Sequence, residues 1–243
     1  MKKHSLILFV SLIMCSALFA QTQPFKISVH PLTDNCYVFV SYGLSGGQPF
    51  PANGLYIVTK EGIVIVDTPW GEDETQQLID SVEQRYHKKI VLSISTHFHA
   101  DRTGGIDVLK KAGTKTYSSL QTLELCKARG EKQAQYYFTK DTTFTVGGVT
   151  VQTYYPGEGH TKDNIVVWLP KQKVLVGGCL VKSTETNNIG NVADANVKQW
   201  PATMQNVINK FPSAKYVIPG HQGGLDKNSL QHTIDVVKSA QDN

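Results

Sequence analysis

The 243-residue sequence predicts an α/β fold in which two packed sheets lie between outer helices, a four-layer αββα sandwich. Short apolar runs rich in β-branched residues recur along the chain and are typical of strands. Segments with helical periodicity alternate with them. The order of strands and helices in the second half is similar in outline to that in the first. We therefore expect a single domain built from two pseudo-equivalent halves.

The individual elements follow from the same patterns. The predicted strands are Cys36–Ser41, Asn53–Thr59, Gly62–Asp67, Ile90–Ser95, Thr143–Val146, Val149–Tyr155, Ile165–Leu169, Val174–Val176 and Tyr216–Ile218. The predicted helices are Glu72–Tyr86, Gly105–Ala112, Ser119–Arg129, Lys198–Lys210 and Asn228–Ala240, with a further short strand between the second and third. Hairpin turns are expected at Lys60–Gly62, Gly147–Gly148 and Pro170–Lys173.

The segment Ser41–Ala52 interrupts this pattern. It contains three glycines and two prolines, which predict a mobile loop between two strands. Tyr42, Leu44 and Phe50 give the loop apolar surface. Both an ordinary hairpin loop and a flap over a pocket remain open interpretations.

The first twenty residues form a basic start, an apolar run from Leu6 to Phe19 and a small-residue end at Ala20. This pattern predicts a signal peptide at residues 1–20, a mature domain at 21–243 and a periplasmic location. The predicted cleavage removes two lysines and no acidic residue, so the formal charge falls from +4 to +2. No basic block indicates a nucleic-acid partner, and no membrane attachment is expected after cleavage.

Three cysteines follow the predicted leader: Cys36, Cys126 and Cys179. They have no CxxC spacing. For Cys36 and Cys126 we expect buried free thiols, although a disulfide between them is possible. A bound metal is one way to protect Cys179 from oxidation.

The strongest chemical motif is His97-Phe98-His99-Ala100-Asp101, directly after a predicted strand. Side chains at positions i and i+2 of an extended segment point to the same side, so His97 and His99 can reach one metal ion. Asp101, on a loop, can reach a neighbouring ion. Imidazole and carboxylate groups are ordinary zinc ligands.

Three further ligand-type residues, His160, Cys179 and His221, each follow a predicted strand and lie beside glycine. Glycine permits the tight backbone that turns a side chain inward. Six ligands are too many for one tetrahedral zinc, whereas three for each of two ions leave open positions for catalysis. Two nearby ions could share a hydroxide.

These residues resemble the metallo-β-lactamase superfamily, and within it the B1 subclass of class B β-lactamases. The resemblance spans about Phe25 to Ala240. It is carried by Asp67-Thr68-Pro69-Trp70, His97–Arg102, Gly159-His160-Thr161, Gly178–Lys182, Gly190-Asn191, Asp194-Ala195-Asn196 and Pro219-Gly220-His221. Arg102 after the HxHxD motif and Cys179 among the ligands separate this pattern from glyoxalase II, lactonases and RNase Z.

The resemblance implies the metallo-β-lactamase fold and two zinc ions per chain. One ion is expected on His97, His99 and His160, and the other on Asp101, Cys179 and His221. Lys182 matches the family's anchor for the substrate carboxylate, and Asn191 its contact with the substrate carbonyl. Asp67 and Arg102 are expected to hold the ligands in place. In this chain Gln222-Gly223 follows His221 in place of the commoner Gly-Glu pair, and the insert Ser183–Asn188 is polar.

The resemblance also implies the activity. We expect a zinc-dependent β-lactamase that opens the amide bond of penicillins, cephalosporins and carbapenems and so confers antibiotic resistance. A metal-bound hydroxide oriented by Asp101 would attack without a covalent enzyme intermediate. The expected partners are small β-lactams, with no nucleic acid and a monomeric chain. Two alternatives are a dizinc hydrolase of another ester, lactone or thioester, and a zinc-storage protein without turnover.

Overall fold

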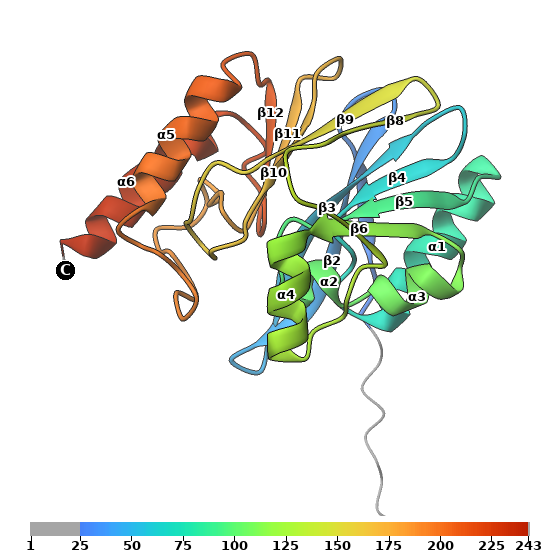
Figure 1. Cartoon of the computed structure of the whole chain (residues 1–243), viewed down its shortest axis with the longest axis horizontal. Helices are drawn as coiled ribbons and strands as arrows, with labels where there is room; N and C mark the ends of the chain where they lie inside the picture. Colours follow the sequence, from blue (N-terminus) through green and yellow to red (C-terminus); the bar gives the residue numbers. More distant parts are fainter. Residues whose placement is uncertain (1–24, 243) are drawn as a thin grey trace, which may run out of the picture.

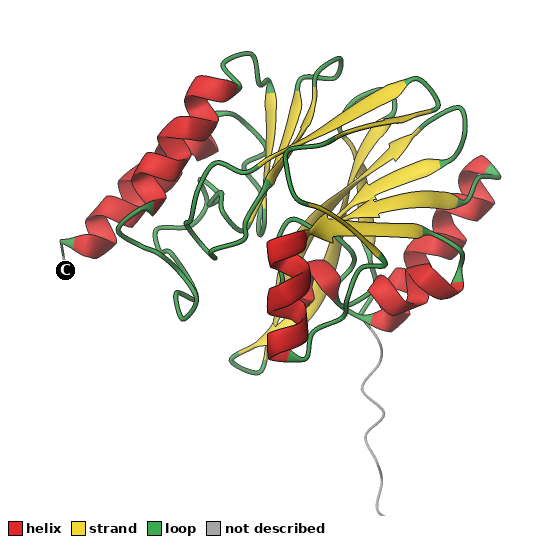
Figure 2. Cartoon of the chain, in the orientation of Figure 1, coloured by secondary structure: helices red, strands yellow, loops and turns green. Residues whose placement is uncertain are grey.

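Two sheets lie face to face, and helices cover both outer surfaces, as Figure 1 and Figure 2 show. The computed structural model describes residues 25–242, so the predicted signal peptide lies outside the described residues. The arrangement confirms the predicted four-layer αββα sandwich. Each half of the chain supplies one sheet and the helices on its outer face, although the two halves differ in size.

The first half forms a sheet with the strand order β1-β2-β3-β4-β5-β6-β7 within the described residues. Strands β1 to β4 pair antiparallel, whereas β4 to β7 pair parallel. The strands are β1 (Ser28–Pro31), β2 (Cys36–Ser45), β3 (Gln48–Val58), β4 (Ile63–Val66), β5 (Ile90–Ile94), β6 (Lys115–Ser119) and β7 (Tyr136–Phe138). The helices of this half are α1 (Glu72–Tyr86), α2 (Ala100–Thr103), α3 (Ile106–Lys111) and α4 (Leu120–Arg129).

The second half forms a sheet with the order β12-β11-β10-β9-β8. Strands β8 to β11 form an antiparallel meander, and β12 joins β11 in parallel. The strands are β8 (Thr143–Val146), β9 (Val149–Tyr154), β10 (Val166–Leu169), β11 (Val174–Gly178) and β12 (Tyr216–Pro219). The helices are α5 (Trp200–Lys210) and α6 (Asn228–Gln241).

The alternation of side chains along the strands builds the core. On β4, Val64 and Val66 point to the space between the sheets, while Ile63 and Ile65 pack toward α1. On β10, Val167 faces the other sheet, and its neighbours face α5 and α6. A strand that is buried on both faces has a continuous apolar sequence, which is why these strands could be predicted from the sequence.

Most predicted elements and all three predicted turns are present, and the differences have physical causes. Strand β7 was not predicted. It is short and lies at the edge of its sheet with Tyr136 and Tyr137 exposed, so its sequence lacks the alternation of apolar and polar residues that is typical of a strand. The expectation that Asp101 lies on a loop is wrong, because it belongs to the single-turn helix α2. Propensity predicts so short a helix poorly, since one turn adds little cooperative stability.

The expected irregular loop at Ser41–Ala52 is instead an extension of the β2–β3 hairpin. The two strands stay paired out to Ser45 and Gln48. Gly46 and Gly47 have φ values of 58° and 76°, the left-handed pair that closes a two-residue hairpin turn. The prolines Pro49 and Pro51 do not disrupt the strand pairing. The number of glycines and prolines in this segment therefore does not indicate an irregular backbone. Figure 1 shows this hairpin projecting from the molecule.

The three cysteines in the described residues are free thiols and buried, so the possible Cys36–Cys126 disulfide is not formed. Among residues 25–242, no helix has the length and apolar character required to cross a membrane.

Candidate metal centre

The candidate ligands gather at one edge of the two sheets because the strands before them end there. Parallel strands direct their carboxyl ends to the same edge. His97 follows β5, Cys179 follows β11 and His221 follows β12. The Asn53 N–H donates to the Gly220 carbonyl at 2.9 Å, which joins the sheets at this edge.

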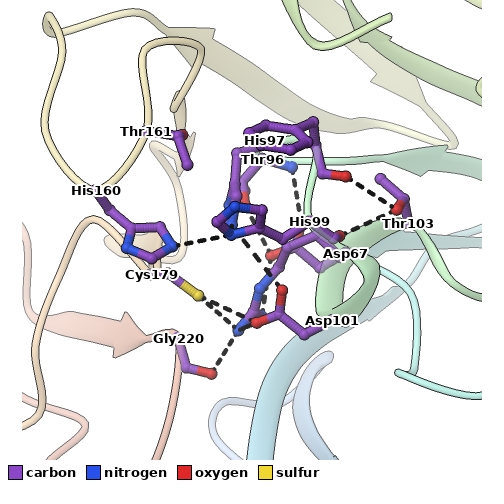
Figure 3. A network of polar contacts seen from close by, with 12 residues as sticks. Asp67, Thr96, His97, His99, Asp101, Thr103, His160, Thr161, Cys179 and Gly220 are labelled. Atoms are coloured by element: carbon purple, nitrogen blue, oxygen red, sulfur yellow. Dashed lines mark hydrogen bonds and ion pairs between the residues drawn. The ribbon is translucent and has the colours of Figure 1, made fainter. Parts of the chain in front are cut away.

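The three histidines His97, His99 and His160 converge on one point. His99 Nδ1 lies 3.2 Å from His97 Nε2 and 3.2 Å from His160 Nε2. Burial lowers the pKa of both His97 and His160 well below the usual range, so these imidazoles are neutral, the state that binds a metal. Figure 3 shows the His160 ring pointing toward His99.

His99 is oriented from its far side. Its Nε2 lies 3.1 Å from the Asp194 carboxylate, and Arg129 contacts the other oxygen of the same carboxylate. An Nε2–H donated to Asp194 leaves the lone pair on Nδ1, which faces the other two rings. This is the carboxylate–histidine arrangement that fixes the tautomer of a metal ligand.

The second cluster contains Asp101, Cys179 and His221. Cys179 Sγ lies 3.2 Å from Asp101 Oδ2 and 3.2 Å from His221 Nε2, and the latter two atoms are 3.3 Å apart. His221 Nδ1 lies 2.6 Å from the Pro51 carbonyl oxygen, so Nδ1 carries the donated proton and Nε2 faces the cluster. Burial acts to lower the pKa of His221, but Cys179 and Asp101 outweigh it and raise the pKa to about 9.

Arg102 connects Asp101 and Cys179. Its guanidinium is buried and places Nη2 3.0 Å from Asp101 Oδ2 and 3.1 Å from Cys179 Sγ. The same nitrogen donates to the Gly220 carbonyl at 2.7 Å, and Nη1 donates to the Asn53 carbonyl. Burial acts to lower the pKa of Arg102, but the surrounding anions outweigh it, so the side chain stays charged. Burial acts to raise the pKa of Asp101. Arg102 outweighs this effect and holds that pKa well below the usual range.

Asp67 holds the start of the HxHxD segment. Its carboxylate accepts from the Thr96 N–H at 2.7 Å and from Thr96 Oγ1 at 3.0 Å. Burial raises the pKa of Asp67 to about 6, although Arg102, 3.4 Å away, acts to lower it. The backbone of Asp67 is left-handed, with φ of 64°. Such conformations in non-glycine residues cost about 1–3 kcal/mol and concentrate at functional sites.

The spacing of the donors fits zinc. A tetrahedral zinc with Zn–N bonds of about 2.0–2.1 Å sets its nitrogen ligands about 3.3–3.4 Å apart, and a sulfur ligand about 3.5 Å from a nitrogen. The nitrogen pairs of the first cluster lie at 3.2 Å, and the sulfur contacts of the second at 3.2 Å. The clusters adjoin each other, because His97 Nε2 is 4.0 Å from Asp101 Oδ1. Glycine is required at position 220, where a Cβ would lie 2.7 Å from Cys179 Sγ.

A cavity of about 510 Å³ opens onto these clusters. His99, Asp101, His160 and His221 line it, while His97 and Cys179 lie beneath. The hairpin residues Leu44 and Phe50 also line the cavity, as does Trp70. The flap interpretation of Ser41–Ala52 therefore gains a pocket beneath the hairpin, whereas its mobility stays a prediction.

Lys182 and Asn191 both line the cavity. Lys182 is buried, with its Nζ 5.1 Å from the centre of the Trp200 ring, and it makes no ion pair within the described residues. Burial lowers the pKa of Lys182. Asn191 is exposed at the rim, where its Oδ1 accepts from the Ala193 N–H at 3.0 Å.

Reasoning from the sequence missed three contributors to the site. Asp194 and Trp70 appear in the sequence only as members of family motifs, and Asn53 only as the start of a predicted strand. Each contacts site residues that are remote in sequence, so local spacing does not indicate its role. Asp194 was the one with a signal, since an acidic residue in a family motif is a candidate partner for a ligand histidine.

Comparisons with known proteins agree with this geometry. The Metallo-beta-lactamase superfamily matches residues 47–221. A metallo-beta-lactamase type 2 of Elizabethkingia meningoseptica is 39% identical over 98% of this chain and 95% of its own length. Another from Bacillus cereus is 42% identical over 87% of this chain and 83% of its own length. The structure of a metallo-beta-lactamase from Pontibacter korlensis superposes with a TM-score of 0.85 at 36% identity, covering 87% of this chain and 99% of that one.

The chain thus belongs to the metallo-β-lactamase superfamily. Within that superfamily it lies close to the class B enzymes of the B1 subclass, as its motifs predicted.

Proposed function

We propose that this chain is a class B β-lactamase that hydrolyses the amide bond of β-lactam rings with two zinc ions. The observation that carries the proposal is the pair of adjoining donor clusters, one of three imidazoles and one of a carboxylate, a cysteine sulfur and an imidazole, at the floor of a cavity with a buried lysine in its wall. The relatives bearing metallo-beta-lactamase names support it.

Each residue of the site has a proposed role. His97, His99 and His160 would hold one zinc, and Asp101, Cys179 and His221 the other. Zinc, when bound, supplies a Lewis acid and lowers the pKa of its water toward neutrality. Asp101, fixed by Arg102, would orient the attacking water, and Asp67 would keep the ligand segment in place through Thr96.

Two residues of the cavity wall, Lys182 and Asn191, would bind the substrate. Lys182 is a cation without an ion pair in the described residues, so its ammonium would bind the carboxylate of the substrate. Asn191 would donate a hydrogen bond from its Nδ2 to the carbonyl of the ring. The hydroxyl of the lining residue Ser183 donates to the Gly223 carbonyl at 2.8 Å and not to a basic side chain, which favours hydrolysis without a covalent intermediate.

Penicillins, cephalosporins and carbapenems are the proposed substrates, with antibiotic resistance as the consequence. We further propose a single mature domain, residues 21–243, that reaches the periplasm through a signal peptide at residues 1–20 and acts as a monomer.

Hydrolysis of a chromogenic cephalosporin by purified protein tests the activity. We expect turnover that disappears with a chelator and returns with zinc, and two zinc ions per chain by elemental analysis. Lys182→Ala should raise KM at least 10-fold, because a charge-assisted contact to the substrate is lost. The matched control Lys171→Ala changes an exposed lysine of the β10–β11 turn and should leave KM unchanged. Zinc-loaded protein that hydrolyses a thioester or lactone but no β-lactam would move the function to another hydrolysis; zinc binding without any turnover would indicate storage.

A further inference from the structure

Gln222 has a backbone conformation that its side chain disfavours. Its φ is 62°, in the left-handed region where L residues other than glycine, asparagine and aspartate are uncommon. Two other non-glycine residues with positive φ have local reasons for it: His87 caps the end of α1, and Lys173 lies in the turn between β10 and β11. Gln222 neither caps a helix nor closes a hairpin.

Contacts with neighbouring elements hold this conformation in place. Asn53 Nδ2 donates to the Gln222 carbonyl at 2.6 Å. The next residue, Gly223, accepts from Ser183 Oγ at 2.8 Å and donates its N–H to Glu185 Oε2 at 3.0 Å. The backbone around Gln222 is therefore fixed on both sides, and glycine at this position would satisfy the same contacts with less strain.

The Gln222 side chain, in contrast, has no hydrogen-bond partner in the described part of the chain. Gln222 is partly buried and lines the cavity together with Lys182, Ser183 and His221. Within residues 25–242 its amide makes no hydrogen bond to the protein, so it remains available to a ligand in the cavity. The contacts of Gly223 with Ser183 and Glu185 place Gln222 beside the segment that begins with Lys182.

We propose that the Gln222 amide is a substrate-binding group, donating a hydrogen bond to the same carboxylate that Lys182 binds. A carboxylate has two oxygens and several acceptor positions, more than one ammonium fills. The amide supplies a neutral donor beside that cation, and the strained backbone is retained because glycine would remove this donor. The inference rests on the proposed β-lactam hydrolysis and adds a residue to its carboxylate site.

The test replaces Gln222 by glycine in the zinc-loaded enzyme. Because strain is relieved, the urea midpoint should rise by about 0.3–0.5 M. Because a donor is lost, KM for a β-lactam with a free carboxylate should rise about 10-fold while kcat changes less than about 2-fold. For the same β-lactam with its carboxylate esterified, the variant and the wild type should have equal KM. Gln222→Asn, which keeps an amide and tolerates the left-handed region, should recover part of the affinity.

Lys173→Gly is the matched control, since Lys173 has φ of 54° and is exposed in a turn that does not line the cavity. It should raise the urea midpoint similarly without any change in KM. An unchanged KM in Gln222→Gly would overturn the inference, as would an equal rise in KM for the esterified substrate. If the wild type hydrolyses no β-lactam at all, the proposed function fails first and this inference falls with it; an active wild type with an unaffected variant refutes only the role of Gln222.

Discussion

Replacing Arg102 by methionine removes the buried guanidinium that contacts Asp67, Asp101 and Cys179. The carbonyls of Asn53 and Gly220 lose a charged donor in the same step. Methionine has a similar length, so the space stays largely filled and the change is mainly electrostatic.

The magnitude follows from the burial of every group involved. Removing one partner of a buried ion pair costs about 3–5 kcal/mol, because the remaining charge is left uncompensated. Protonation limits the cost: without Arg102 the pKa of Asp67 rises further above 6, and the carboxyl can take up a proton near neutral pH. We therefore expect the free energy of unfolding of the metal-free protein to fall by about 3–5 kcal/mol at pH 7.5, and by less at pH 5, where Asp67 is already protonated.

Urea unfolding of chelator-treated protein at the two pH values measures this loss. Arg129→Met is the matched control, because the side chain of Arg129 is 57% exposed and its ion pair with Asp194 lies near the surface; its loss should cost less than about 1 kcal/mol. If Arg102→Met destabilised the metal-free protein no more than this control, or equally at both pH values, the interpretation of Arg102 as the charge centre of the site would be refuted.

Three other predictions concern the neighbours of the ligands and the buried thiols. Asp194→Ala should weaken zinc binding about 10- to 100-fold, because His99 loses its orienting acceptor; competition with a chromophoric chelator measures it, and unchanged affinity would contradict the role. Asp67 binds a proton more tightly in the folded state, so its contribution to stability falls by about 3 kcal/mol as the pH rises from about 3 to about 7; in Asp67→Asn this fall should be missing from urea midpoints of the metal-free protein. Burial raises the pKa of Cys36 to about 11 and that of Cys126 to about 12, so a thiol reagent at pH 8 should modify them only after unfolding; rapid labelling of native protein would disprove this.

The sequence allowed most of the site to be predicted because ligand-type residues stand directly after apolar runs. His97, Cys179 and His221 follow β5, β11 and β12, and a run that ends at a sheet edge places the next residue at that edge. The family motifs then predicted the pairing of ligands. The extension of the β2–β3 hairpin through Ser41–Ala52 could not be predicted, because its glycines and prolines suggest a mobile loop, whereas pairing along the whole segment decides its structure.

By itself, the sequence determined the fold class, the candidate ligands and the direction of the chemistry, since these depend on the kinds of residue and their order. Only the tertiary structure decided which nitrogen of each histidine faces the clusters. The Pro51 carbonyl orients His221, and Asp194 orients His99, from segments remote in sequence. It also decided that Gln222 has a left-handed backbone, because the carbonyl of that residue bonds to Asn53 on the opposite sheet. Contacts of this kind form only when the two sheets pack together, and no local pattern encodes them.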